Sequence, residues 1–254
     1  MKATLEVDEH HWWYRGRRRI IRAELAQLAL PAHARVLDAG CGSGRTLQEL
    51  AGYGDVHGIE LDEGAAELAR SRGQGEVLVG RLEALPWAQD SFDLITCLDV
   101  IEHTPDDRAT LAELLRVTKP SGYMLVTVPA YQALWSLHDE ANHHYRRYGR
   151  RTLREAAHAA GWTVIRMSSF NSLLLAPAAV VRLLQRRVGT HEGYTNDLNL
   201  GPRWLNSVLE RPLDLESRWL AYGHTLPVGL SLLAVLQKPW APRVSLAAGR
   251  PPGE

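Results

Sequence analysis

The sequence predicts an α/β fold, in which a doubly wound and mostly parallel sheet carries helices on both faces. Short apolar runs alternate with helical stretches from Arg35 to Pro129, which is typical of βαβ units. The length of 254 residues suits one large domain with an appendage. The 45% hydrophobic and 23% charged residues are those of an ordinary globular protein, and they exclude a disordered chain, a collagen-like repeat and a disulfide scaffold.

The strands and helices of this region follow one another in a regular order. Short apolar runs predict five strands, at 35–39, 56–60, 77–79, 92–98 and 123–128. Between them, apolar residues at three-to-four spacing predict helices at 46–51, 63–72 and 106–118. Pro120, Ser121 and Gly122 predict a turn before the fifth strand. A sheet of this kind binds its ligands at the carboxyl ends of its strands.

The remaining residues predict additions to the sheet. Thr152 and Glu155 form a capping box that opens a helix ending near Gly161, and strands follow at 162–167 and 229–237. The roughly 60 residues between these two strands are too many for a plain loop, so we expect a helical cap insertion there. The expected domains are an N-terminal aromatic and helical segment (1–34), the core (35–168 with 229–240), the cap (169–228) and a loose tail (241–254).

The charge balance and the cysteine content restrict which binding partners and which cellular compartment are expected. The 29 basic and 29 acidic residues cancel, so the chain as a whole has no attraction to nucleic acid or to an anionic membrane. Two cysteines and a polar start without a secretory signal predict a cytoplasmic protein. The apolar run 173–181 is too short to span a membrane. Followed by Arg182, Arg186 and Arg187, it either packs as a cap helix or contacts a membrane surface peripherally.

The most informative stretch lies between the first strand and the first helix of the sheet, where Gly40, Gly42 and Gly44 stand at alternate positions. Glycines let the backbone turn tightly and let an anionic group approach the N–H groups of a helix N-terminus. The spacing is G-x-G-x-G and not the G-x-G-x-x-G of dinucleotide-binding loops. Asp38 at the strand end suits an ammonium group, and Glu60, about 20 residues on, suits ribose hydroxyls. Together they predict a ligand in which an amino acid is joined to a nucleoside.

Four motifs in one order carry a resemblance to a known family. They are DAGCGSG at 38–44, GIELD at 58–62, LPW at 85–87 before SFDLI at 91–95, and DVIEH at 99–103. The chain resembles the class I S-adenosylmethionine-dependent methyltransferases, and in particular the ubiquinone and menaquinone methyltransferase-like group of small-molecule enzymes. The resemblance implies a Rossmann-like, seven-stranded sheet whose last strand is antiparallel. It also implies S-adenosylmethionine as the cofactor.

The same resemblance implies a cofactor site at the strand ends. Its residues are Asp38, Gly40, Cys41, Gly42, Gly44, Glu60, Leu61, Leu82 and Asp99. Asp38 and the glycine loop would hold the methionine part, and Glu60 would hold the ribose. Leu61 and Leu82 would flank the adenine. Asp99 would lie beside the methionine part or the reacting centre.

One position departs from the pattern of that family. An acid commonly follows the third strand there and takes the adenine amino group, whereas this chain has Arg81 at the aligned position. Glu83 is the nearest acid. The resemblance therefore leaves the adenine contacts open.

Methyl transfer from a sulfonium is an in-line displacement, and a base is needed only where the acceptor must lose a proton. Three histidines are base candidates: His103 at the mouth of the sheet, unless it belongs to the framework of its motif, and His138 and His144 in the loop after the fifth strand. In that loop Arg146 and Arg147 are expected to pair with a phosphate or carboxylate of the acceptor. The loop has no fixed ligand spacing, so no metal site is predicted.

Aromatic residues complete the set of substrate candidates. Trp13 and Tyr14, in a dense aromatic cluster ahead of a basic helix, are either packing anchors or part of a lid. Tyr131, directly after the fifth strand, is expected beside the acceptor. The basic helix has an apolar stripe opposite its arginines, made of Ile20, Ile21, Leu25 and Leu28 against Arg17, Arg18 and Arg22.

These features favour an enzyme that methylates oxygen, nitrogen or carbon of a small molecule. The candidate acceptors are aromatic, natural-product, lipid-linked or sugar-bearing molecules, anionic or apolar in character. The arginine runs at 15–22 and 146–154 suggest a nucleic-acid methyltransferase as the alternative. The zero net charge and the lack of an Asn/Asp-Pro-Pro-aromatic element after the fourth strand disfavour it. A non-methylating cyclase or binding protein on the same fold stays open, since fold and function separate easily. The sequence does not indicate an oligomeric state.

Overall fold

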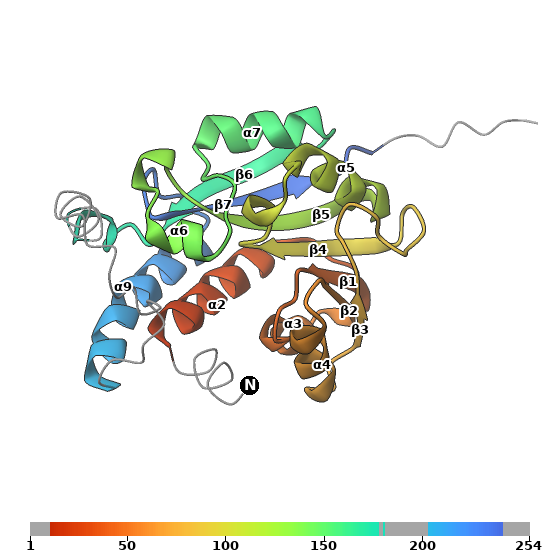
Figure 1. The fold of residues 1–254 in the computed structure, drawn as a ribbon, viewed down its shortest axis with the longest axis horizontal. Coiled ribbons are helices and arrows are strands. Elements are labelled where there is room, and N and C mark those ends of the chain that lie inside the picture. The colour runs from red at the N-terminus through yellow and green to blue at the C-terminus, as the bar shows by residue number, and fades with distance from the viewer. Residues whose placement is uncertain (1–10, 178–179, 181–202, 241–254) are drawn as a thin grey trace, which may run out of the picture.

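A seven-stranded sheet in the order β3-β2-β1-β4-β5-β7-β6 forms the centre of the molecule (Figure 1). The computed structural model describes residues 11–177, 180 and 203–240. The strands are β1 (Ala34–Ala39), β2 (Gly54–Glu60), β3 (Glu76–Val79), β4 (Phe92–Leu98), β5 (Thr118–Pro129), β6 (Thr163–Phe170) and β7 (Ser231–Gln237). Strands β1 to β5 pair in parallel, and β7 runs antiparallel to both of its neighbours. The predicted fold class, with its antiparallel last strand, is confirmed.

Helices cover both faces of the sheet. They are α2 (Trp12–Leu25), α3 (Arg45–Leu50), α4 (Glu63–Ser71), η1 (Ile101–His103), α5 (Asp107–Val117), η2 (Gln132–Leu134), α6 (Leu137–Ala141), α7 (Arg150–Ala159) and α9 (Arg203–Ala221). Adjacent strand residues belong to different cores, because successive side chains of a strand point to opposite faces. Leu37 and Ile95 lie in the core with α5 and α7, whereas Val36 and Leu94 lie in the core with α2, α3 and α9.

The stretch predicted as a turn before the fifth strand is instead part of β5. The pairing register of β4 with β5 shifts between Phe92 and Leu94, and Ser121 has a positive φ of 63°, so the strand is irregular here rather than interrupted. The strand continues through this stretch because its backbone pairs with Lys238, a residue far along the chain. Ser121 N donates to Lys238 O, and Lys238 N donates to Gly122 O, which continues the pairing beyond β7.

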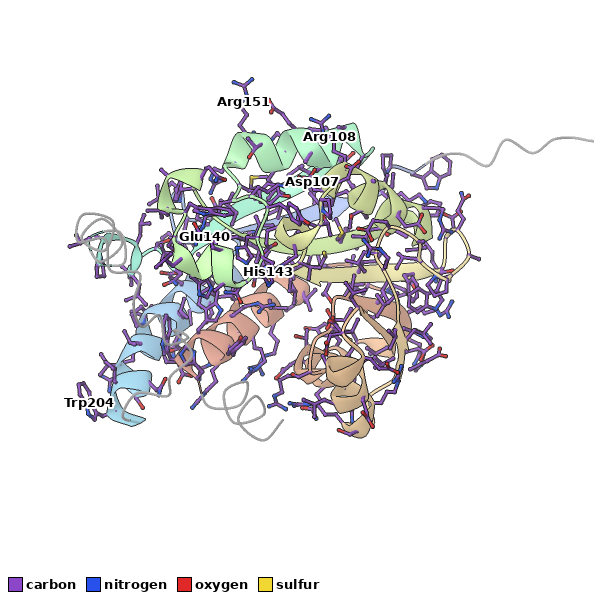
Figure 2. The ribbon with its side chains drawn as sticks, in the orientation of Figure 1. Asp107, Arg108, Glu140, His143, Arg151 and Trp204 are labelled. Atoms are coloured by element: carbon purple, nitrogen blue, oxygen red, sulfur yellow. The ribbon has the colours of Figure 1, made fainter. Side chains whose placement is uncertain are left out.

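The N-terminal helix and the insertion helix pack against each other on one face of the sheet (Figure 1). Ile20, Ile21 and Leu25 of α2 are buried there, as the apolar stripe predicts, together with Leu213 and Leu220 of α9. Other helical side chains, in contrast to this buried contact, point outward from the molecule. Figure 2 shows Arg151 of α7 and Trp204 of α9 projecting away from the body of the molecule.

No helix among the described residues has both the length and the apolar character needed to cross a membrane. In the run predicted as a cap helix or membrane contact, Leu173 and Val180 are exposed. Arg182, Arg186 and Arg187 lie outside the described residues, as does the predicted tail 241–254. The peripheral contact therefore stays a prediction.

The contact between α2 and α9 depends on the absence of a side chain at Gly16. We expect Gly16→Val to lower the free energy of unfolding by about 2–3 kcal/mol, which is the cost of overpacking a filled site. An added Cβ would stand 2.3 Å from Leu213 Cδ1 and 2.6 Å from Leu213 Cβ. Urea unfolding followed by circular dichroism measures the effect. Gly52→Val is the matched control, since the nearest heavy atom to a Cβ there is 3.8 Å away. Equal stability of the two variants would contradict the close helix contact.

Candidate active site

The loop that joins β1 to α3 turns on glycines in the left-handed region. Gly40 has φ of 76°, and an added Cβ would stand 2.6 Å from Val100 Cγ2, so both conformation and space require glycine there. Gly42 has φ of 52°, but an added Cβ would meet nothing within 4 Å. Gly44 is the N-cap of α3, where a Cβ would stand 2.7 Å from Ala69 Cα in α4. Gly42 therefore borders open space, whereas Gly40 and Gly44 allow close packing.

Asp38 lies at the carboxyl end of β1 with 2% of its surface exposed. Its Oδ1 accepts a hydrogen bond of 2.6 Å from the hydroxyl of Thr96 on the neighbouring β4. Burial raises the pKa of Asp38 to about 6, against the smaller opposing effects of the Thr96 hydrogen bond and the Arg17 charge. The side chain is therefore a carboxylate at neutral pH that loses its charge in mild acid.

Glu60 is the last residue of β2, and hydrogen bonds to its carboxylate connect the glycine loop with the turn that follows β2. Its Oε2 accepts from Gly42 N at 2.8 Å, and its Oε1 accepts from Leu61 N at 2.8 Å and from Asp62 N at 3.1 Å. A carboxylate offers about four acceptor positions, so Oε2 retains one. Asp62 in turn caps α4, where its Oδ1 accepts from Ala65 N at 2.7 Å.

Asp38, the glycine loop and Asp62 border a cavity of about 590 Å³, within the range of small-molecule sites, whereas Glu60 is not among its lining residues. The lining from the sheet side includes Asp38, Gly40, Cys41, Gly42, Ser43, Asp62 and Leu98. The lining from α2 consists of Tyr14, Arg17, Arg18 and Ile21. The N-terminal helix is thus one wall of the cavity.

Arg17 of that wall contacts the end of β4, and the sequence pattern did not predict it as a site residue. Its Nε lies 3.2 Å from Asp99 Oδ2, and its side chain donates to Leu98 O at 3.1 Å. Asp99 itself has a positive φ of 56° directly after β4. The helical pattern alone put Arg17 and Arg18 on the face opposite the apolar stripe, and only the docking of α2 over the strand ends turns them toward the cavity.

The predicted adenine contacts occupy different environments. Leu61 is 61% exposed, whereas Leu82 is 8% exposed and belongs to the core on the α5 side. The guanidinium of Arg81 lies 3.4 Å from the carboxylate of Glu83, so the two residues that replace the usual acid contact each other. Which of these residues touch a cofactor stays a prediction.

The structure brings the three predicted base candidates together. The rings of His103 and His144 have centroids 4.5 Å apart at 86°, and those of His138 and His144 are 6.2 Å apart at 84°. Burial and the neighbouring His144 lower the pKa of His103, so this imidazole is neutral at physiological pH. His103 and His144 come from loops after β4 and β5, and the parallel sheet places both loops at one edge.

The other predicted substrate residues have partners within the protein. Trp13 stacks on Phe170 with ring centroids 5.7 Å apart at 13°. The guanidinium of Arg146 lies 3.1 Å from Asp107 Oδ1. Arg147 is buried and donates to Asp139 Oδ1 at 2.7 Å. Tyr131, partly buried, packs against the core and donates its N–H to Tyr148 O at 2.9 Å. Their contact with an acceptor stays a prediction.

A buried acid lies beside the histidines. Glu102 has no exposed surface and neither of its carboxyl oxygens has a hydrogen-bond partner in the described part of the chain. Burial and the charge of Asp99 raise its pKa well above the usual range. Ligand atoms of Glu102, His103 and His144 lie within 4.8 Å of one another. A raised pKa makes the carboxyl hold its proton more strongly, which opposes metal binding, so the trio alone does not indicate a metal centre.

Comparison with known proteins agrees with this architecture. A family model described as a methyltransferase domain matches residues 12–167. The ubiquinone biosynthesis O-methyltransferase of Thiobacillus denitrificans is 34% identical over 100 residues, which are 37% of this chain and 43% of that protein. The chain therefore matches less than half the length of this curated relative.

Two solved structures share the fold at low identity. The Haemonchus contortus phosphoethanolamine N-methyltransferase 2 in complex with S-adenosyl-L-methionine has a TM-score of 0.58 and 18% identity, over 87% of this chain and 52% of that one. The cyclase SpnF has a TM-score of 0.58 and 19% identity, over 87% of this chain and 81% of that one. With the family model matching more than half of the residues, the chain belongs to the class I S-adenosylmethionine-dependent methyltransferase domain family.

Proposed function

We propose that this protein transfers the methyl group of S-adenosylmethionine to a hydroxyl oxygen of a small-molecule acceptor. The observation that carries the proposal is the cavity of about 590 Å³, where a buried carboxylate, a glycine loop and an arginine of α2 converge. The family match supports the cofactor. The name of the Thiobacillus relative, an O-methyltransferase, supports a hydroxyl as the acceptor group.

The chemistry of the cofactor fits the residues of the cavity. Its ammonium would meet the carboxylate of Asp38, and its carboxylate would meet the guanidinium of Arg17. The remaining acceptor position on Glu60 Oε2 suits a ribose hydroxyl. Gly42, where an added Cβ would meet nothing within 4 Å, leaves room for the ligand beside the loop.

When bound, the cofactor supplies a methyl group on a positively charged sulfur. The chain contributes alignment and exclusion of water, because in-line displacement gains most from fixed geometry in a closed site. Tyr14, Arg17 and Ile21 of α2 cover the cavity. Asp99 pairs with Arg17 and precedes η1, which carries His103, one of the histidines that would face the acceptor.

A catechol is a suitable first probe of this activity, with a primary amine as the probe for nitrogen transfer. Incubation of the full chain with S-adenosylmethionine and each probe, followed by mass spectrometry of S-adenosylhomocysteine, tests the reaction. Release with catechol supports oxygen transfer. Bound cofactor without release in any reaction would favour a non-methylating role, such as that of the cyclase with the same fold.

We expect Asp38→Asn and Glu60→Gln each to weaken S-adenosylmethionine binding by about 10- to 100-fold, since each removes a charge-assisted hydrogen bond. Isothermal titration calorimetry measures the affinity. Glu63→Gln is the matched control, because Glu63 is an exposed acid of the first turn of α4. If both site variants bind like the wild-type protein, the cofactor site is assigned to the wrong residues.

Cofactor affinity is also expected to depend on pH. Because burial raises the pKa of Asp38 to about 6, its carboxylate is charged above this pH and neutral below it. Affinity should be full at neutral pH and fall by up to about tenfold for each pH unit well below 6. Calorimetric titrations across this range check the slope. Asp38→Asn should abolish this dependence and Glu60→Gln should keep it, whereas a flat profile for the wild-type protein would contradict the role of Asp38.

A further inference from the structure

The segment of residues 130–149, between β5 and α7, is fixed over the end of β4. Tyr131 N donates to Tyr148 O and Tyr148 N donates to Pro129 O, both at 2.9 Å, which joins the two ends of the segment. Near its middle, Tyr145 N donates to Glu102 O at 2.7 Å. The segment therefore holds its histidines against η1.

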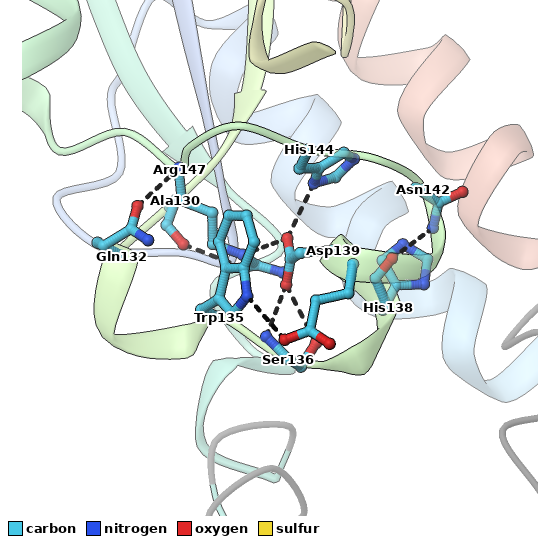
Figure 3. A network of polar contacts seen from close by, with 10 residues as sticks. Ala130, Gln132, Trp135, Ser136, His138, Asp139, Asn142, His144 and Arg147 are labelled. Carbon is cyan, nitrogen blue, oxygen red and sulfur yellow. Dashed lines mark hydrogen bonds and ion pairs between the residues drawn. The ribbon is translucent and has the colours of Figure 1, made fainter. Parts of the chain in front are cut away.

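Asp139 is the centre of this segment and has no exposed surface. Its Oδ1 accepts from His144 Nδ1 at 2.9 Å and from Arg147 Nε at 2.7 Å, and its Oδ2 accepts from Ser136 N at 2.8 Å (Figure 3). Burial acts to raise the pKa of Asp139, but the hydrogen bonds from His144 and Arg147 outweigh it and hold the pKa well below its usual range. Asp139 is therefore an anion at physiological pH.

An ionised carboxylate only accepts hydrogen bonds, which determines the tautomer of a neutral His144. Nδ1 must carry the hydrogen, so the lone pair lies on Nε2 at the far side of the ring. Figure 3 shows one ring nitrogen turned toward Asp139 and the other turned away. Within the described residues Nε2 has no hydrogen bond. A carboxylate orients the basic histidine of Ser-His-Asp hydrolases in the same manner.

His144 lies beside η1, which begins two residues after Asp99. Its ring packs against that of His103 in a T-shaped arrangement, with centroids 4.5 Å apart. Asp99 is bound to Arg17 in the cavity wall. A series of neighbours thus leads from Arg17 in the cavity wall through Asp99 to η1 and the two imidazoles, which are not themselves among the residues that line the cavity.

We propose that His144 is the general base of the methyl transfer and that Asp139 is its positioning residue, an inference that rests on the proposed function. His144 Nε2 takes the proton of the acceptor hydroxyl, and the oxygen forms its bond to the methyl carbon while the bond from carbon to sulfur breaks. The electron pair of that bond remains on sulfur, and S-adenosylhomocysteine leaves neutral at sulfur. The proton then passes from His144 to water.

The test uses two acceptors that differ in acidity. A catechol needs a base, whereas a nitrocatechol whose phenolic proton is already lost at the assay pH does not. We expect His144→Asn to lower kcat with catechol by about 10²- to 10⁴-fold, the usual contribution of a general base. With the nitrocatechol the loss should be under about tenfold. Asn at this position keeps a donor for Asp139 and lacks a basic atom, so the fold of the segment is preserved.

Asp139→Asn tests the positioning role and should give the same acceptor-dependent loss of kcat with little change in KM. His143→Asn is the matched control, since His143 is the exposed neighbouring histidine with a positive φ of 57° and should keep wild-type rates on both acceptors. Calorimetry with S-adenosylmethionine should give wild-type affinity for all three variants. This measurement separates loss of the base from loss of the fold.

Four outcomes would overturn the base assignment. An equal loss with both acceptors would give His144 a structural role, and unchanged rates would remove it from the reaction. Loss of activity on dialysis against EDTA, restored by Mg²⁺ or Zn²⁺, would make Nε2 a metal ligand beside Glu102 and His103. Wild-type protein that binds the cofactor but methylates neither catechol would overturn the hydroxyl acceptor and the base together, whereas absence of cofactor binding would overturn the proposed function itself.

Discussion

The pairing of β1 with β4 sets the position of the groups in the candidate site. These strands run in parallel with Asp38 opposite Thr96, so the Thr96 hydroxyl reaches a carboxylate that is otherwise removed from water. The strand order reverses at this pair, because β1 continues to β2 and β3 on one side and β4 continues to β5 on the other. Loops that leave the two strands diverge and open a crevice. The glycine loop, Asp99 and η1 all lie at that opening.

The two buried carboxylates near this opening, Asp38 and Asp139, lie in different electrostatic environments. On the cofactor side, burial leaves Asp38 charged at neutral pH but close to its protonation point. On the acceptor side, donors from His144, Arg147 and Ser136 keep Asp139 permanently charged. A buried anion is costly unless it is paired and hydrogen-bonded, and the 130–149 segment supplies those partners from within eight residues of Asp139. Besides η2 and α6, these polar contacts hold the segment together.

Much of this architecture could be predicted from local pattern, and the exceptions have a common cause. The strand Phe92–Leu98 was predicted with its observed bounds because it is a mostly apolar run, in which only Asp93 and Thr96 are polar. Arg17 was placed on the outer face of its helix, since its contact with Asp99 joins positions about 80 residues apart that no periodicity connects. Asp139 carries no local signal of its burial, because that burial depends on His144 folding back onto it. Local sequence predicts elements, while their mutual docking decides which charged side chains become buried.

The dependence of α2 on α9 bears on how this protein can be divided or recombined. The region that matches the family ends at residue 167, before β7, which pairs with both β5 and β6, and before the helix that Gly16 contacts. A fragment cut at that boundary would leave an open edge on β5 and an uncovered apolar face on α2. The wall that α2 forms for the cavity, the proposed cofactor site, thus depends on the insertion. Exchange of the insertion between relatives, as a way to change the acceptor, would change cofactor binding at the same time.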